Sequence, residues 1–379
     1  MLRLGFSLVL ILALLTIWLE AAWVVLLLEA ALFALGGCLV CFPGGAGARA
    51  TPAGWALAAL AAVGVVQLVS GSTISAFDTL QGVLFWLSLA TAAALAGSLW
   101  PSRRQSESLL SAAAAGASGL SMVATLQWFT SSGRFFWVWP SADPNVFGPF
   151  QSRNNFASFV LLFLPFVAGQ WLGSADWRRW PWLVGAGTMI GGVMASGSRA
   201  GAGLVVAELV ILLIVHLRGR RQRRGALALI SVAAIALAVL GWDVLARKLK
   251  DTDPLRYRRE MMHSAAQMTS ASPLTGLGLE TFPTVYPAFA KFDSGHFVNH
   301  AHNDWLEIAA EAGIVGWAGL PLAVLVFLRR CARQPGGLGI AAVSIHALVD
   351  YPFQRLGLAV WIVAIAAATA TSASQRKSD

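Results

Sequence analysis

Long apolar runs recur almost from one end of the sequence to the other, and they constrain the fold more than any other feature. A helix that crosses a bilayer needs about 20 mainly apolar residues. Twelve spans are expected, near residues 4–19, 21–42, 53–70, 79–99, 109–129, 154–173, 181–197, 200–217, 225–244, 304–328, 336–349 and 357–373. The sequence therefore predicts an all-α, polytopic transmembrane bundle.

The composition supports a membrane protein and argues against a nucleic-acid partner. Of the 379 residues, 57% are apolar and only 12% are charged, whereas a soluble domain carries about 25% charged residues. The net charge of +9 could suggest nucleic-acid binding. The arginines, however, lie in short loops between apolar runs, where they set the orientation of a membrane protein.

Basic residues fall in alternate connections between the expected spans, and this spacing predicts the topology. The clusters are Arg3, Arg49, Arg103–Arg104, Arg178–Arg179, Arg218 to Arg224, Arg329–Arg333 and Arg376–Lys377. Because short basic loops stay in the cytoplasm, we expect twelve spans with both termini cytoplasmic. The outer side then receives residues 130–153, 197–201, 245–303 and 350–356.

This topology divides the chain into four regions. They are N-terminal transmembrane helices (1–129), central helices with arginine-bearing outer turns (130–244), a large outer loop (245–303), and C-terminal helices with a cytoplasmic tail (304–379). In the loop, Arg256 to Ser270 has the pattern of an amphipathic helix, and Pro273 ends it. We expect the loop to lie on the membrane surface and to cap a cavity in the outer leaflet.

The densest polar constellation lies at the start of the expected span 304–328. It comprises His296, Asn299, His300, His302, Asn303, Asp304, Glu307 and Glu311. Asp304 can cap the helix and Glu307 can complete a capping box. Glu311 lies one turn deeper, where a carboxylate is costly unless it is paired or faces a wet cavity. His302 lies at the mouth of such a cavity, and an imidazole can act as the base for a hydroxyl nucleophile.

Arginines on the predicted outer side are exceptions to the rule that basic residues collect on the cytoplasmic side. They suggest an anionic ligand, because a guanidinium matches phosphate oxygens. Arg199 lies in the short turn Ser196–Gly201, and Arg256, Arg258 and Arg259 open the loop helix. A single such arginine could merely snorkel, and the group of three could bind lipid head groups.

Two further polar patches lie at ends of spans on the outer side. The first is Gln151–Asn155, with Arg153, where Asn154 or Asn155 could simply cap the helix. The second is His346 with Asp350 and Tyr351, where the histidine in an apolar run marks an interior face.

A metal or nucleotide cofactor is not supported by the sequence. His300 and His302, together with His296, could bind zinc, but no further ligand at helical spacing is evident. Cys38 and Cys41 form a CxxC inside an apolar run and lack a second ligand pair. No Walker loop or dinucleotide fingerprint is present. The cavity would suit an amphipathic substrate with its phosphate at the lipid interface and a hydrophilic remainder outside.

The sequence resembles the O-antigen ligase family. His302-Asn303, then nine residues, then Gly313-Ile314-Val315-Gly316 is similar to that family's H-N-x9-G-x-x-G signature. Further matching segments occur in order between about residues 145 and 355. They are Gln151–Asn155, Ser198–Gly201, Arg258, Pro273–Gly278, Phe282, His346 and Asp350-Tyr351. The chain has Met262 where the family often has Trp, and either Arg256 or Arg259 could replace Arg258 as the equivalent of the family's loop arginine.

The resemblance implies a GT-C-like membrane glycosyltransferase of the bacterial inner membrane with a periplasmic active site. Its donor would be an undecaprenyl-diphosphate-linked glycan, and no nucleotide, metal or other cofactor would be required. By position, His302 would be the catalytic base, and Arg199 and Arg258 would hold the diphosphate. The other substrate-binding residues would be Arg153, Asn155, Arg256, Arg259, His300, Asn303 and Glu311.

Two activities within the family, and one outside it, fit the sequence. A ligase would transfer the glycan to a sugar of lipid A-core, whereas a polymerase would join lipid-linked repeat units of O-antigen or exopolysaccharide. The two share the donor and differ in the acceptor, and we favour the ligase. A secondary transporter would show broken helices at the membrane midplane and matched halves, and neither is evident in the sequence.

Overall fold

In a computed structural model of this chain, helices make up nearly all the secondary structure. The structure describes residues 1–19, 21–41, 51–141, 143–174, 176–216, 220–241, 256–292, 295 and 297–375. Within these residues the only sheet is a hairpin of β1 (Arg134–Phe135) and β2 (Trp139–Pro140). The prediction of an all-α protein is confirmed. His296, part of the outer loop and the basic residues Arg49, Arg218, Arg376 and Lys377 lie outside the described residues.

The chain forms two compact units, each assembled from separate stretches of sequence. The first unit comprises Met1–Arg103, Asp253–Arg330 and Ala347–Asp379. The second comprises Arg104–Thr252 and Cys331–His346.

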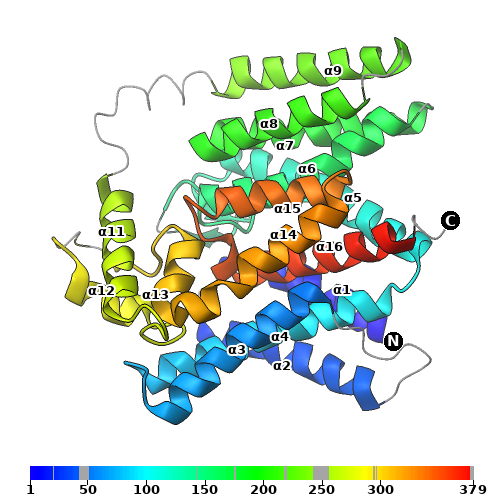
Figure 1. Cartoon of the computed structure of the whole chain (residues 1–379). Helices are drawn as coiled ribbons and strands as arrows, with labels where there is room; N and C mark the ends of the chain where they lie inside the picture. The colour runs from blue at the N-terminus through cyan, green and yellow to red at the C-terminus, as the bar shows by residue number, and fades with distance from the viewer. Residues whose placement is uncertain are drawn as a thin grey trace. The chain divides into compact units, whose positions relative to one another are not determined.

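The first unit is organised around α4, which packs against α2, α3 and α16. Its helices are α1 (Leu2–Leu15), α2 (Ala22–Cys41), α3 (Pro52–Ser70), α4 (Ala76–Leu99), α11 (Arg256–Ala271), α12 (Phe282–Phe289), α13 (Asp304–Trp317), α14 (Gly319–Cys331) and α16 (Leu356–Gln375). A 3-10 turn, η3 (Pro352–Gln354), precedes α16. Figure 1 shows α11, α12 and α13 grouped together, and α11 confirms the predicted amphipathic helix.

Local sequence signals set the ends of the helices that frame this unit. The Thr51 hydroxyl accepts a hydrogen bond from the Gly54 amide at 3.0 Å, and Pro52 follows as the first residue of α3. Gly71, in the left-handed conformation at φ 67°, ends the same helix. These are the caps that such residue types favour, because they satisfy amides and carbonyls that have no partner within the helix.

The second unit has α6 at its centre. Its helices are α5 (Arg103–Thr130), α6 (Arg153–Gly173), α7 (Trp180–Ser196), α8 (Arg199–His216), α9 (Arg220–Ala236) and α15 (Pro335–His346); a 3-10 turn, η1 (Trp177–Arg179), precedes α7, and a π-helical turn, η2 (Leu237–Gly241), follows α9. Nearly every residue of α6 is buried, and the helix packs against α7, α8, α9 and α15. Figure 1 shows α7, α8 and α9 running side by side.

Each of the twelve predicted spans has a counterpart among the helices, but they differ in length. Seven single helices of the described residues are long and apolar enough to cross a membrane, and a bent pair could add an eighth. In contrast, α1 has 14 residues and α15 has 12. At a rise of 1.5 Å per residue, such helices fall short of a hydrocarbon core of about 30 Å. A polytopic protein is thus confirmed, and the number twelve stays a prediction.

The predicted single span 304–328 is wrong. In its place lie α13 and α14, which are bent by 76° relative to each other. Within α13, Gly313 has φ 63° and ψ −177°, a conformation that interrupts the helix. The sequence showed no evident broken helix, whereas the structure contains this one.

Candidate active site

A glycine-rich loop, Pro273–Gly278, docks against the break in α13. A Cβ atom on Gly276 would overlap the backbone of Glu311, and one on Gly313 would overlap the backbone of Leu274. Both glycines also have positive φ, at 71° and 63°. Each of these two positions therefore requires glycine, both because of its backbone conformation and because two backbones approach closely there.

Hydrogen bonds replace those that the helix loses at this break. The Gly278 amide donates to the Glu311 carbonyl at 3.0 Å, and the Ile314 amide donates to the Pro273 carbonyl at 2.9 Å. The buried side chain of Gln67, on α3, donates to the same Glu311 carbonyl at 2.7 Å. Because buried backbone groups need partners, the loop and Gln67 make the broken helix stable.

The start of α13 differs from its predicted capping. Asn303 is the N-cap, and its side chain accepts a hydrogen bond from the Leu306 amide at 3.1 Å. The predicted cap by Asp304 and the predicted capping box are therefore wrong. The Asp304 carboxylate instead accepts from the Phe353 amide at 2.8 Å, which fixes the turn before α16. Asn303 thus positions α13.

Glu307 holds the chain that enters α13. One of its oxygens lies 2.8 Å from Nδ1 of His300, and the other accepts a hydrogen bond from the Ala301 amide at 2.6 Å. His300 is buried, and its ring stacks on Tyr351 with centroids 4.5 Å apart. This arrangement orients His300 and leaves its Nδ1 engaged.

His302 lies against a buried carboxylate at the head of α13. Its Nδ1 is 3.4 Å from Oδ1 of Asp350, which is completely buried, while the His302 side chain is 23% exposed. The ring of Tyr351 meets His302 edge to face at 4.8 Å. His302 has φ 53°, a conformation uncommon outside glycine. A partly exposed imidazole beside a buried carboxylate has the arrangement of a general base.

Glu311 points away from solvent. Its Oε1 accepts a hydrogen bond from the Phe282 amide at 3.0 Å, at the start of α12. Its side chain is 1% exposed. These contacts give Glu311 a role in joining α12 to α13, whereas the sequence suggested substrate binding.

Glu280, which the sequence did not single out, lines the same cavity as His300. Burial raises the pKa of this carboxyl above its ordinary value; His300 opposes the shift, and Glu307 and Asp78 add to it. Its backbone has φ 60°.

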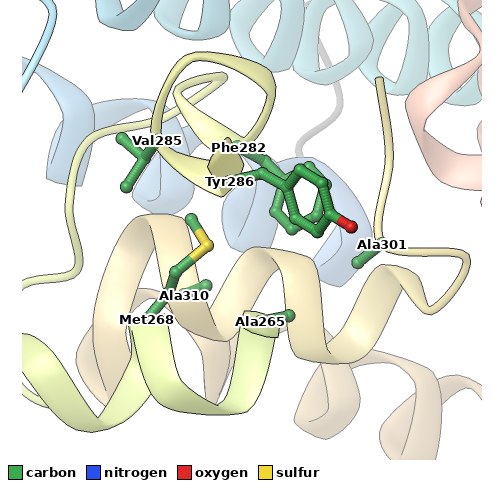
Figure 2. Close-up of a cluster of buried hydrophobic side chains, with 7 residues drawn as sticks. All are labelled: Ala265, Met268, Phe282, Val285, Tyr286, Ala301 and Ala310. Carbon is green, nitrogen blue, oxygen red and sulfur yellow. The ribbon is translucent and has the colours of Figure 1, made fainter. Parts of the chain in front are cut away.

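An apolar cluster joins α11, α12 and α13 around this site (Figure 2). It comprises Ala265, Met268, Phe282, Val285, Tyr286, Ala301 and Ala310, which come from α11, α12, α13 and the chain before α13. The rings of Phe282 and Tyr286 lie 5.5 Å apart, centroid to centroid. Fully burying a side chain such as Phe contributes about 1.5–3 kcal/mol. The cluster therefore fixes α11 relative to the start of α13.

The three arginines of the loop helix lie together at the start of α11. Arg256 is exposed and stacks over Phe292 at 5.0 Å. Arg258 is half-buried, and Arg259 is exposed. All three belong to the same unit as His302.

The remaining candidates lie in the second unit. Ser152 caps α6, since its hydroxyl accepts from the Asn154 amide at 3.3 Å, so the suggested asparagine cap is wrong. Asn155 is buried, and Arg199 is exposed as the first residue of α8. Gly201 lets α8 approach α6 closely, because an added Cβ would lie 2.6 Å from Ala157.

His346 confirms the predicted interior face. It is buried, and its Nδ1 lies 2.7 Å from the hydroxyl of Ser158 on α6.

The first unit thus brings together His300, His302, Asn303 and Glu311, while Arg153, Asn155 and Arg199 belong to the second. No individual role was predicted for Asp350 or Tyr351. The sign in the sequence was that a charged residue and an aromatic residue directly follow an apolar run. An ionisable residue at such a position is costly, which indicates a functional role. In the described part of the chain, no three His, Cys, Asp or Glu side chains are placed to hold a metal ion.

These features define a polytopic, all-helical membrane protein with a candidate general base at the head of a broken helix. Residues 184–320 match a family model described as O-antigen ligase, which confirms the resemblance seen in the sequence. The match includes Arg199, Arg258, His302 and the glycines of the break, and Asp350 lies beyond it. No curated protein matches the chain.

Proposed function

We propose that this protein transfers a glycan from undecaprenyl diphosphate to a sugar hydroxyl of lipid A-core, at the periplasmic face of the bacterial inner membrane. The observation that carries the proposal is the pairing of His302 with buried Asp350, since His302 lies in the segment that matches the O-antigen ligase family. The family match alone supports a ligase- or polymerase-like membrane protein.

In the proposed reaction, His302 removes the proton of the acceptor hydroxyl. That oxygen forms a bond to the anomeric carbon of the donor glycan while the bond from this carbon to the diphosphate oxygen breaks. The imidazolium that results is stabilised by the carboxylate of Asp350. A single attack opposite the leaving group would invert the anomeric configuration, so a product with retained configuration would contradict this step.

The second requirement of the mechanism is to stabilise the leaving group. Undecaprenyl diphosphate leaves with its charge, and guanidinium groups fixed nearby would stabilise that charge as it develops. We assign this role to Arg258, which belongs to the same unit as His302, with Arg256 and Arg259 as alternatives. Because the diphosphate bond is already activated, the reaction needs no ATP, and it proceeds without a metal ion.

A polymerase of the same family is the second candidate. It would use the same donor and base, and its acceptor would be a second lipid-linked repeat unit. The nature of the acceptor therefore decides between the two.

The test uses the purified full chain with an undecaprenyl-diphosphate-linked glycan, EDTA, and either lipid A-core or a second lipid-linked unit as acceptor. We expect transfer by the wild type and a fall of roughly 100-fold or more in His302→Ala, since general-base catalysis contributes about 10²–10⁴-fold. His263→Ala is the matched control, because His263 is an exposed histidine on α11. Full activity in His302→Ala would remove His302 as the base.

A further inference from the structure

A cavity of about 310 Å³ opens beside the candidate base, within the first unit. Its polar lining consists of Thr16, Glu280, Asn299, His300, Gln354 and Arg355. Its apolar lining comes mainly from α1, α2 and α4, through Ala13, Ile17, Val24, Val25, Leu28 and Phe85. This volume lies at the lower end of the range of about 300–1,000 Å³ found for small-molecule sites.

Gln354 has the most unusual environment in this lining. It is 9% exposed, and neither its amide nitrogen nor its carbonyl oxygen has a hydrogen-bond partner among the described residues. An unpaired buried amide costs free energy. A ligand that both donates and accepts hydrogen bonds would remove that cost.

The backbone around Gln354 is held rigidly. Asp304 accepts a hydrogen bond from the Phe353 amide, and Arg355 donates to the Ile17 carbonyl at 2.7 Å. Gln354 therefore joins the cavity lining from a fixed turn.

The charge balance of the lining favours a neutral ligand. Arg355, the cationic residue of the lining, already donates to a backbone carbonyl. Glu280 is acidic, and the Nδ1 of His300 is engaged by Glu307. A phosphate would meet a carboxylate here, whereas hydroxyl groups can bond to a carboxylate and to amides.

The cavity is linked to His302 by direct contacts. His300, which lines the cavity, stacks on Tyr351, and Tyr351 contacts the ring of His302. The segment 350–355 therefore supplies both the carboxylate beside the base and the amide in the cavity.

We propose that this cavity is a carbohydrate subsite that binds a neutral, hydroxyl-rich sugar ring of the acceptor. Asn299 and Gln354 bond to the ring hydroxyls, and the apolar wall packs against the ring carbons. The identity of the sugar as the acceptor rests on the proposed function, whereas the binding of a sugar does not.

The test measures binding without turnover. The full chain in lipid nanodiscs is mixed with methyl glycosides of glucose, galactose and N-acetylglucosamine, and contact is measured by saturation-transfer NMR. We expect saturation transfer to the ring protons of at least one glycoside, reduced roughly tenfold or more in Gln354→Leu and Asn299→Ala. Gln375→Leu, at the far end of α16, is the matched control and should bind like the wild type.

Gln354→Leu also separates binding from a structural role. Because leucine removes an unpaired buried amide, the thermal unfolding midpoint should stay the same or rise while sugar binding is lost. Absence of binding by every glycoside, or unchanged binding in both variants, would overturn the proposal. So would binding of glycerol phosphate in place of the glycosides.

A second readout links the cavity to catalysis. In the transfer assay, Gln354→Leu should raise the KM for the acceptor roughly tenfold and leave the KM for the donor unchanged. A raised donor KM alone would contradict the assignment to the acceptor. Gln354-dependent sugar binding by a protein that transfers no glycan would refute the proposed function and leave the subsite in place.

Discussion

Asp350 is the residue on which the geometry of the candidate base depends. Its carboxylate is completely buried, and His302 Nδ1 is the ionisable nitrogen found 3.4 Å away. A buried carboxylate is costly unless it has a partner or a task. Stabilising a protonated His302 would supply both.

We therefore expect Asp350→Asn to lower kcat of glycan transfer by roughly 100-fold. The amide has the same shape as the carboxylate but cannot stabilise an imidazolium, so the KM for either substrate should change little. Steady-state kinetics measure this split. A variant with normal kcat and a raised KM would show that Asp350 only shapes the substrate site. Asp143→Asn, in an exposed turn of the second unit, is the control.

Glu280 makes the folding stability of the protein depend on pH. Its pKa is raised by burial, so the folded state favours the protonated carboxyl. Below the ordinary pKa the group carries no penalty, and as the pH rises toward the raised pKa the folded protein loses stability.

Glu280→Gln should therefore stabilise the protein progressively more, relative to the wild type, as the pH rises from about 4 to about 8. The measurement is the thermal unfolding midpoint of both proteins across that range. Parallel curves would show that Glu280 titrates normally. Because Glu280 also lines the cavity, transfer activity is not the readout here.

At the scale of elements, the break in α13 depends on two glycines. Gly313→Ala places a methyl group into the backbone of Leu274 and forces alanine to φ 63°. We expect a loss of about 1–3 kcal/mol in the free energy of unfolding, together with a loss of activity. The control is Gly319→Ala, where an added Cβ meets nothing within 4 Å. Equal thermal midpoints for the two variants would contradict this account.

The sequence predicted helices far better than it predicted this break. Apolar runs of about 20 residues identify membrane helices because lipid leaves few alternatives. The break at Gly313 involves Gly276, 37 positions earlier by number, whose role depends on a long-range contact. A single glycine in an apolar run gives no local sign of such a partner. Only the fold shows why glycine is required at Gly313 and Gly316 of the signature, where neighbouring atoms leave no room for a Cβ.

The candidate site shows the same limit. His302 and Asn303 were both predicted from their match to the family signature. The pairing with Asp350 joins residues 48 positions apart by number, and periodicity cannot show it. The capping prediction failed because Asn303 and Asp304 are both good N-caps, and only the contact of Asp304 with Phe353 decides between them.

At the scale of the whole molecule, the basic residues predict which side of the membrane holds each loop. Arg178 and Arg179 end a short basic connection, whereas α11 belongs to the predicted outer loop. The proposed reaction requires the side that holds α11 to be periplasmic, because α11 packs against α13 and the chain that carries His302 into it.

Single cysteines test this topology in intact cells. In a background with Cys38, Cys41 and Cys331 replaced by Ser, His263→Cys should react with a membrane-impermeant maleimide, since His263 is exposed on α11. Asp176→Cys, which is equally exposed beside the basic turn, should react only after the inner membrane is permeabilised. The opposite pattern would place α11 in the cytoplasm. A periplasmic lipid-linked donor could not then reach His302, and the proposed reaction would fail with the topology.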